Sequence, residues 1–255
     1  MHEALFLHDY AFDKVIHDLP GGIPFLFPVC ARLARNNQPG VYLLDHRQYK
    51  LKIHGFSWFT AWEVIKTTQH SIEMVLKENI NTIQIYPFRF EIKLKYIVSN
   101  GKLSCYQIYK NTEQNKSMPY YAGFHPYFST RHIPKEKIIL NCDFKKRLKY
   151  NHDLTDIVGE QAVFAVPTDI ANLEINEQLC ILGKDKLATL TFPNGDILKT
   201  IADEKFSYMQ LYHIPEKSFF CVERWMSFPN ALNAVSGVHW LKPGESQSAV
   251  FEVFV

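Results

Sequence analysis

Long apolar runs, export signals and clustered cysteines are all missing from this sequence. No uncharged apolar stretch reaches the roughly 20 residues that cross a bilayer, and the longest candidate, residues 20–31, contains three prolines and two glycines. The first ten residues lack both a basic segment and a small-residue cleavage site, so we expect no export signal. These absences predict a cytoplasmic protein with no membrane partner.

An excess of charge of one sign is missing too. The 255 residues include 28 basic and 26 acidic side chains, for a formal net charge of +2. A chain this close to neutrality has no field that would collect nucleic acid, so we expect a small, neutral molecule as partner and no nucleic acid.

Cysteines are few and scattered. The five cysteines form no Cys-x-x-Cys pair, are odd in number and lie mostly in apolar segments. This pattern predicts reduced, buried thiols rather than disulfides, as is usual in the cytoplasm.

What the sequence has in quantity is period-two alternation. Residues 90–96 place Phe90, Ile92, Leu94 and Tyr96 on one face and charged residues on the other, which is typical of a half-buried strand. Similar patterns predict further strands at 72–77, 137–142, 187–192, 206–213 and 219–225, with an inner strand at 249–255. Helical periodicity is scarce, and only residues 171–182 suggest a short helix. The expected fold is all-β, a large antiparallel β-sandwich with few short helices, formed as a single domain over 1–255.

A histidine in an aromatic segment is the first candidate for chemistry. His125 lies in the sequence Gly-Phe-His-Pro-Tyr-Phe, and Pro126 both favours extended backbone before it and removes a ladder donor. We therefore expect the strand to end or bulge at His125, where the imidazole can face a cleft. The alternative is a buried histidine with a purely structural role.

A carboxylate on an apolar strand is the second candidate. If residues 219–225 form a strand, Glu223 shares one face with Phe219, Cys221 and Trp225. Burial there should raise the pKa of Glu223, which suits a general base near neutral pH. A salt bridge to an arginine or histidine on a neighbouring strand explains the same pattern equally well.

Several segments, in order along the chain, resemble the aldose 1-epimerase (galactose mutarotase-like) family. They are Phe-Pro-Val-Cys-Ala-Arg-Leu at 27–33, Lys-Ile-His-Gly-Phe at 52–56, the histidine segment at 123–128, the segment at 221–233 that begins Cys-Val-Glu-Arg-Trp and contains Pro-Asn-Ala-Leu-Asn, and Leu-Lys-Pro-Gly-Glu-Ser at 241–246. The resemblance covers nearly the whole chain, from about residue 20 to the C-terminus.

This resemblance implies a supersandwich with a sugar cleft and an isomerase that interconverts the α and β anomers of an aldose. It implies His125 as general acid, Glu223 as general base, and Arg32 and His54 as residues that bind the sugar hydroxyls. It implies no cofactor and no metal. For His125 to start protonated, its pKa must lie near or above neutrality, and we expect the Glu223 carboxylate across the cleft to raise it.

Three departures from the family pattern accompany the match. Arg224 follows Glu223 where many relatives have proline, and Ala31 precedes Arg32 where asparagine or glycine is common. The family's sugar-binding aspartate has no clear counterpart. The segment that should contain it, residues 169–181, offers Asp169, Glu174 and Asn176.

Other functions remain open at this point. The substrate could be a hexose phosphate, with Arg32, Arg35 and Arg89 as an anion subsite, or the protein could bind sugars without catalysis. A metal-dependent β-sandwich enzyme is disfavoured because the 11 histidines form neither His-x-His nor His-x₃-His pairs. We expect a monomer or a homodimer.

Overall fold

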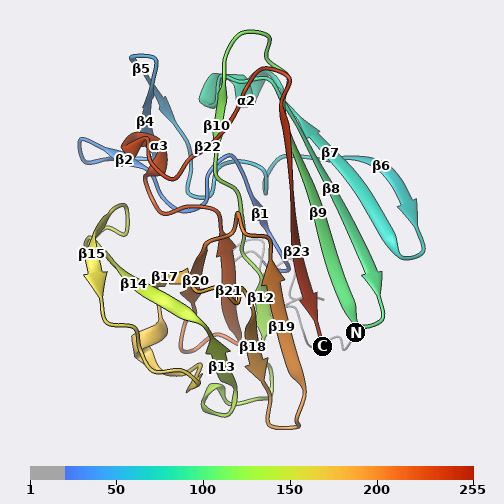
Figure 1. Cartoon of the computed structure of the whole chain (residues 1–255), viewed down its shortest axis with the longest axis vertical. Coiled ribbons are helices and arrows are strands. Elements are labelled where there is room, and N and C mark those ends of the chain that lie inside the picture. The colour runs from blue at the N-terminus through green and yellow to red at the C-terminus, as the bar shows by residue number, and fades with distance from the viewer. Residues whose placement is uncertain (1–20) are drawn as a thin grey trace.

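The alternating segments form strands of two large antiparallel sheets, which the structure, a computed structural model, describes for residues 21–255 (Figure 1). α-Helix in this range is confined to the short segments α2 (Ile80–Ile85) and α3 (Ala231–Ala234). The predicted all-β antiparallel class with few short helices is therefore confirmed.

Within the described residues, one sheet has nine strands in the order β16, β13, β18, β19, β23, β9, β8, β7, β6. Their bounds are Thr168–Asp169, Ile139–Cys142, Ala188–Thr191, Ile197–Ala202, Ser246–Phe254, Lys102–Asn111, Phe90–Ser99, Ser71–Lys77 and Glu63–Thr68. The C-terminal strand β23 pairs with β19 on one side and β9 on the other, which confirms it as an inner strand. β8, β9 and β23 run side by side through the centre of this sheet (Figure 1).

The other large sheet has eight strands in the same range, ordered β1, β11, β21, β20, β17, β14, β15, with β12 also paired to β21. Their bounds are Phe25–Leu26, Gly123–Phe124, Phe219–Trp225, Tyr208–Tyr212, Gln178–Leu182, Phe144–Tyr150, Ile157–Gln161 and Tyr127–Ser129. The predicted strand at 219–225 is β21, and all seven of its residues are buried.

Short hairpins and 3₁₀ turns complete the described chain. The hairpins pair β2 with β3 and β4 with β5, and a separate two-stranded sheet pairs β10 with β22, which are distant in sequence; the bounds of these six strands are Ala34–Arg35, Gln38–Pro39, Val41–Leu44, Arg47–Lys50, Met118–Tyr120 and His239–Leu241. The 3₁₀ turns are η1 (Lys135–Lys137) and η2 (Leu173–Ile175). The β4–β5 hairpin, α3 and α2 gather at one end of the molecule (Figure 1).

Both sheets contribute to one large apolar core. It includes Phe90, Ile92 and Leu94 from β8 and Phe220 and Val222 from β21. The five cysteines are all free and buried, as expected. None of the helices in residues 21–255 is long and apolar enough to cross a membrane.

A buried arginine links the two sheets. The Arg224 side chain is fully buried, and its Nη2 donates hydrogen bonds to the carbonyl oxygen and Oγ1 of Thr200 on β19, both at 2.9 Å. Its Nε and Nη1 have no hydrogen-bond partner among the described residues. Arg224 therefore spans from one sheet to the other with its charge only partly compensated.

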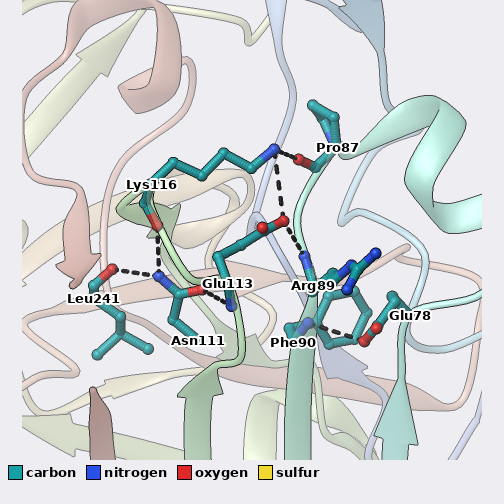
Figure 2. Close-up of polar contacts among 8 residues, drawn as sticks. All are labelled: Glu78, Pro87, Arg89, Phe90, Asn111, Glu113, Lys116 and Leu241. Atoms are coloured by element: carbon teal, nitrogen blue, oxygen red, sulfur yellow. Dashed lines mark hydrogen bonds and ion pairs between the residues drawn. The ribbon is translucent and has the colours of Figure 1, made fainter. Parts of the chain in front are cut away.

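A cluster of polar residues forms hydrogen bonds where β8 begins and β9 ends (Figure 2). Asn111 Nδ2 donates to the carbonyl oxygens of Lys116 and Leu241, at 2.9 and 2.8 Å. Its Oδ1 accepts from the Glu113 backbone, and Glu113 Oε1 accepts from the Arg89 backbone at 2.8 Å. Since these partners are mostly backbone groups, the cluster satisfies peptide donors and acceptors that the sheet leaves unpaired.

One prediction from the sequence is wrong, and another concerns residues that the structure does not describe. The helix expected at 171–182 is wrong, because this segment forms η2 and then strand β17. Residues 178–182 pair on both sides, with β14 and β20, and this tertiary pairing overrides the weak helical pattern. The inference about export, which concerned residues 1–10, lies outside the described residues.

Candidate active site

A cavity of about 200 Å³ is lined by residues of β20 and β21 and by the loops that contain Arg32 and His54. The four residues that the sequence analysis proposed all line it: Arg32, His54, His125 and Glu223. Two polar residues that it did not propose also line it, Glu177 and Gln210. Aromatic rings form much of the remaining wall, namely Trp58, Tyr127, Tyr150, Tyr212 and Trp225.

His125 reaches the cavity because the chain leaves the sheet between β11 and β12, as the following proline predicted. Its backbone N–H donates to Pro24 O at 3.0 Å, and its side chain is almost fully buried. Gly123, two residues earlier, allows β11 to approach β21 closely, since a Cβ there would lie 2.9 Å from Trp225 Cδ1. His125 Nε2 lies 3.2 Å from Glu223 Oε1.

Glu223 is held at both carboxylate oxygens. Oε1 faces His125, and Oε2 accepts a hydrogen bond of 2.9 Å from Trp225 Nε1, two residues along the same strand face. The side chain is 2% exposed. Burial, with the nearby Glu177 charge adding to it, raises the pKa of Glu223 well above its ordinary value, as expected.

The expected pKa of His125 is wrong in direction. Burial lowers it to about 3 rather than raising it toward neutrality. Removing both groups from water disfavours both charges, and this cost exceeds the attraction between an imidazolium and a carboxylate. The imidazole is therefore neutral at neutral pH, and burial favours the protonated form of the Glu223 carboxyl group.

His54 is fixed by a two-way contact with Ala31. The Ala31 backbone N–H donates to His54 Nδ1, and the His54 backbone N–H donates to Ala31 O, both at 3.0 Å. Because Nδ1 accepts, a neutral His54 carries its proton on Nε2. Burial lowers the pKa of His54 well below its ordinary value, with His125 and Arg32 adding to the effect, so the ring is neutral. His54 thus offers an N–H donor to a ligand oxygen.

The backbone of this loop is strained around the contact. Ala31 and His54 have φ values of 70° and 64°, in the left-handed region that glycine and asparagine adopt more readily. This geometry gives a physical reason why asparagine or glycine would suit the position of Ala31 better than alanine. Gly55 also has a positive φ of 74°, and a Cβ there would lie 2.2 Å from Phe27 O.

A metal site is a further possibility to test, because one potential ligand atom of each of His54, His125 and Glu223 lies within 4.8 Å of the others. Two histidines and a carboxylate are a known ligand set for transition metals. A ligating histidine normally donates its second ring N–H to an acceptor. His54 Nδ1 instead accepts from a backbone N–H, which leaves no lone pair on Nε2 for a metal. The donor set therefore does not fit a resident metal ion.

Arg32 and Glu177 bring opposite charges to the cavity wall. Asn230 N donates to Arg32 O at 2.9 Å and so fixes the backbone beside the guanidinium. Glu177 Oε2 accepts from Gln210 Nε2 at 3.2 Å, and Gln210 Oε1 accepts from Tyr150 OH at 2.8 Å. Burial raises the pKa of Glu177, and Arg32 opposes that rise.

Glu177 was missed in the sequence, although it lies within the segment searched for the sugar-binding aspartate. Of the three candidates named there, none lines the cavity. Asn176, for example, accepts from the His213 backbone at 3.0 Å. Glu177 was not proposed because a helix was expected over this segment. The short apolar run at 179–182 has the length of a strand instead, and Glu177 lies just before the strand that contains it.

The anion subsite that was left open as an alternative does not assemble. Arg35 lies on β2 and Arg89 belongs to the polar cluster at the start of β8, and neither lines the cavity. Arg32 is the one lysine or arginine among the described residues that does.

Comparison with known protein families identifies the family of this chain. A family model described as Aldose 1-epimerase matches residues 13–253. The plasmid and chromosomal forms of protein LacX from Lactococcus lactis subsp. lactis are each 27% identical over 120 residues, or 46% of this chain and 40% of the relative. The aligned region thus spans less than half the length of these curated relatives.

Solved structures share the fold. The Slr1438 protein from Synechocystis sp. PCC 6803 is 25% identical, with a TM-score of 0.81 over 98% of this chain and 83% of that one. A galactose mutarotase related enzyme from Lactobacillus acidophilus is 21% identical, with a TM-score of 0.75 over 92% and 83%. The galactose 1-epimerase from Lactobacillus acidophilus NCFM is 14% identical, with a TM-score of 0.70 over 90% and 78%. At these identities, the last two show the fold alone.

Proposed function

Because the chain belongs to the aldose 1-epimerase family, we propose that it interconverts the α and β anomers of a neutral aldose by acid–base ring opening and closure. The observation that carries this proposal is the 3.2 Å contact between His125 Nε2 and Glu223 Oε1 inside a cavity sized for one small ligand. A protein that only bound sugars would have no need of an imidazole and a buried carboxyl group in direct contact.

The proposed chemistry acts on two oxygens attached to the same carbon. Glu223 removes the proton of the anomeric hydroxyl while His125 donates a proton to the ring oxygen, and the C1–O5 bond breaks. The C1–C2 bond then rotates, and the reverse transfers close the ring on the other face. Since the two sugar oxygens are neighbours, the acid and the base must also be neighbours, as His125 and Glu223 are.

The shifted pKa values of His125 and Glu223 favour one of the two protonation states that this mechanism uses. After ring opening, Glu223 holds the proton from the anomeric hydroxyl and His125 is neutral, which is the state that burial favours in the empty site. Ring opening needs the opposite distribution, with the proton on His125. The bound sugar's hydroxyl groups and the Arg32 charge can stabilise the Glu223 carboxylate in that state.

Three groups are proposed to hold the sugar, and a fourth orients one of them. Arg32 and the Nε2–H of His54 donate, Glu177 accepts, and Gln210 orients Glu177. At about 200 Å³ the cavity is smaller than the roughly 300–1,000 Å³ typical for drug-sized ligands, which suits a single sugar ring. The cavity wall has one guanidinium and two carboxyl groups, which favours a neutral aldose over a hexose phosphate.

Polarimetry on freshly dissolved α-glucose and α-galactose, with hexose 6-phosphates assayed by exchange NMR, tests this proposal. We expect the purified protein to accelerate mutarotation of at least one neutral aldose, without any effect of a chelator. Acceleration only of the phosphates would refute the neutral substrate. Sugar binding with no acceleration of any aldose would instead indicate a binding protein.

A further inference from the structure

The His125 ring lacks the usual support at its second nitrogen. Nδ1 is buried and has no hydrogen-bond partner among the described residues. Catalytic imidazoles are commonly oriented by an acceptor at that position. Some other contact must therefore keep Nε2 directed at Glu223.

Tyr127 provides that contact. Its ring lies parallel to the His125 imidazole, with a centroid separation of 4.6 Å and an interplanar angle of 6°. His54 and Tyr212, by contrast, meet the same imidazole edge-on, at 87° and 85°. Tyr127 is thus the ring that covers a face of His125.

Tyr127 is itself firmly held. It is 3% exposed, its backbone N–H donates to Gly22 O at 2.9 Å, and it pairs with Cys221 on β21. Its ring packs against Phe219 at a centroid distance of 5.1 Å and an angle of 61°. Since β21 also carries Glu223, the strand that holds Tyr127 is paired directly with the strand that holds the carboxyl group.

We propose that Tyr127 is a positioning residue, whose ring fixes the His125 imidazole so that Nε2 faces Glu223 and the sugar's ring oxygen. This inference rests on the proposed function for its catalytic consequence. The flat ring, rather than the hydroxyl group, performs the role. When His125 is protonated, the same ring face stabilises the imidazolium as well.

Tyr127→Phe and Tyr127→Leu separate the ring from the hydroxyl. We expect the phenylalanine variant to keep kcat within about threefold of the wild type. The leucine variant should lose about 10- to 100-fold in kcat, as expected for a misplaced catalytic group, with KM changed by less than about threefold. If leucine keeps the wild-type kcat, or if phenylalanine loses as much as leucine, the proposal is wrong.

Thermal unfolding of each variant is the control for correct folding. If Tyr127→Leu does not fold, Tyr127→Met, which retains a long apolar side chain, replaces it.

A second readout, by NMR, does not depend on activity. NOEs and side-chain couplings of His125 in the sugar-free protein should report one ring orientation in the wild type and Tyr127→Phe, and several in Tyr127→Leu. An unchanged single orientation in Tyr127→Leu would overturn the proposal even if no aldose proves to be a substrate.

Discussion

Glu223→Gln should lower the rate of catalysis by orders of magnitude and stabilise the fold at the same time. Gln is close in shape to the protonated carboxyl group that burial favours. Its amide oxygen can still accept from Trp225 Nε1, and its amide nitrogen can donate to the neutral Nε2 of His125. Loss of the general base should lower kcat by about 10²–10⁴, equivalent to about 2.7–5.5 kcal/mol in the barrier.

The stability change has a defined sign and pH dependence. A carboxyl group whose folded pKa is raised gives stability that is present below its ordinary pKa of 4.5 and is lost as the pH rises through the folded pKa. In that interval the folded wild type holds a proton that the unfolded chain releases, which costs about 1.4 kcal/mol per pH unit. Glutamine carries no such cost.

Urea unfolding of both proteins at pH 5, 6, 7 and 8, together with polarimetry, measures both effects. The variant's advantage in free energy of unfolding should be smallest at pH 5 and grow with pH. Glu223→Ala is the matched control, because it loses the same base but also both hydrogen bonds and should be less stable than the wild type. A Glu223→Gln protein that keeps wild-type turnover, or whose advantage shrinks as the pH rises, would refute the reasoning.

Three other substitutions test the surroundings of the site. Ala31→Gly should raise the free energy of unfolding by about 0.5–1 kcal/mol in thermal or urea unfolding, because it relieves the positive φ, whereas the control Ala34→Gly in β2 should lower it. His54→Asn keeps an acceptor for the Ala31 N–H and loses Nε2, so KM in polarimetry should rise about tenfold with the melting temperature little changed; an unaltered KM would remove His54 from the sugar site. Arg224→Met should leave the free energy of unfolding within about 1 kcal/mol or raise it, since the buried charge is only partly paired. Arg224→Ala should lower it by about 3 kcal/mol through the cavity it leaves, and equal losses in both variants would contradict this account.

Most strands were predictable because the alternation of apolar and polar residues within each segment indicates them. Residues 90–96 alternate apolar and charged side chains, and β8 buries Phe90, Ile92 and Leu94 as that pattern requires. The segment at 171–182 has no such clear period, and its structure depends on pairing with β14 and β20, which are distant in sequence. Local patterns could not supply those partners.

The site residues likewise fall into those that local sequence features predict and those that depend on distant contacts. His125 was placed by its proline and Glu223 by its position on an apolar strand, both of which are short-range features. Glu177 was not found, because its role depends on the path of the chain before β17 and on the hydrogen bond from Gln210 on β20. The tautomer of His54 likewise depends on a backbone N–H that lies 23 residues away.

By itself, then, the sequence determined the all-β class, the absence of a strong electrostatic field, and the two residue types that can act as acid and base. The tertiary structure alone decided their distance, their shared burial and the direction of the His125 pKa shift. The reason is physical: charge balance and periodicity are sums over neighbours in the chain, whereas the cost of ionising His125 and Glu223 depends on how much water the folded protein leaves around them.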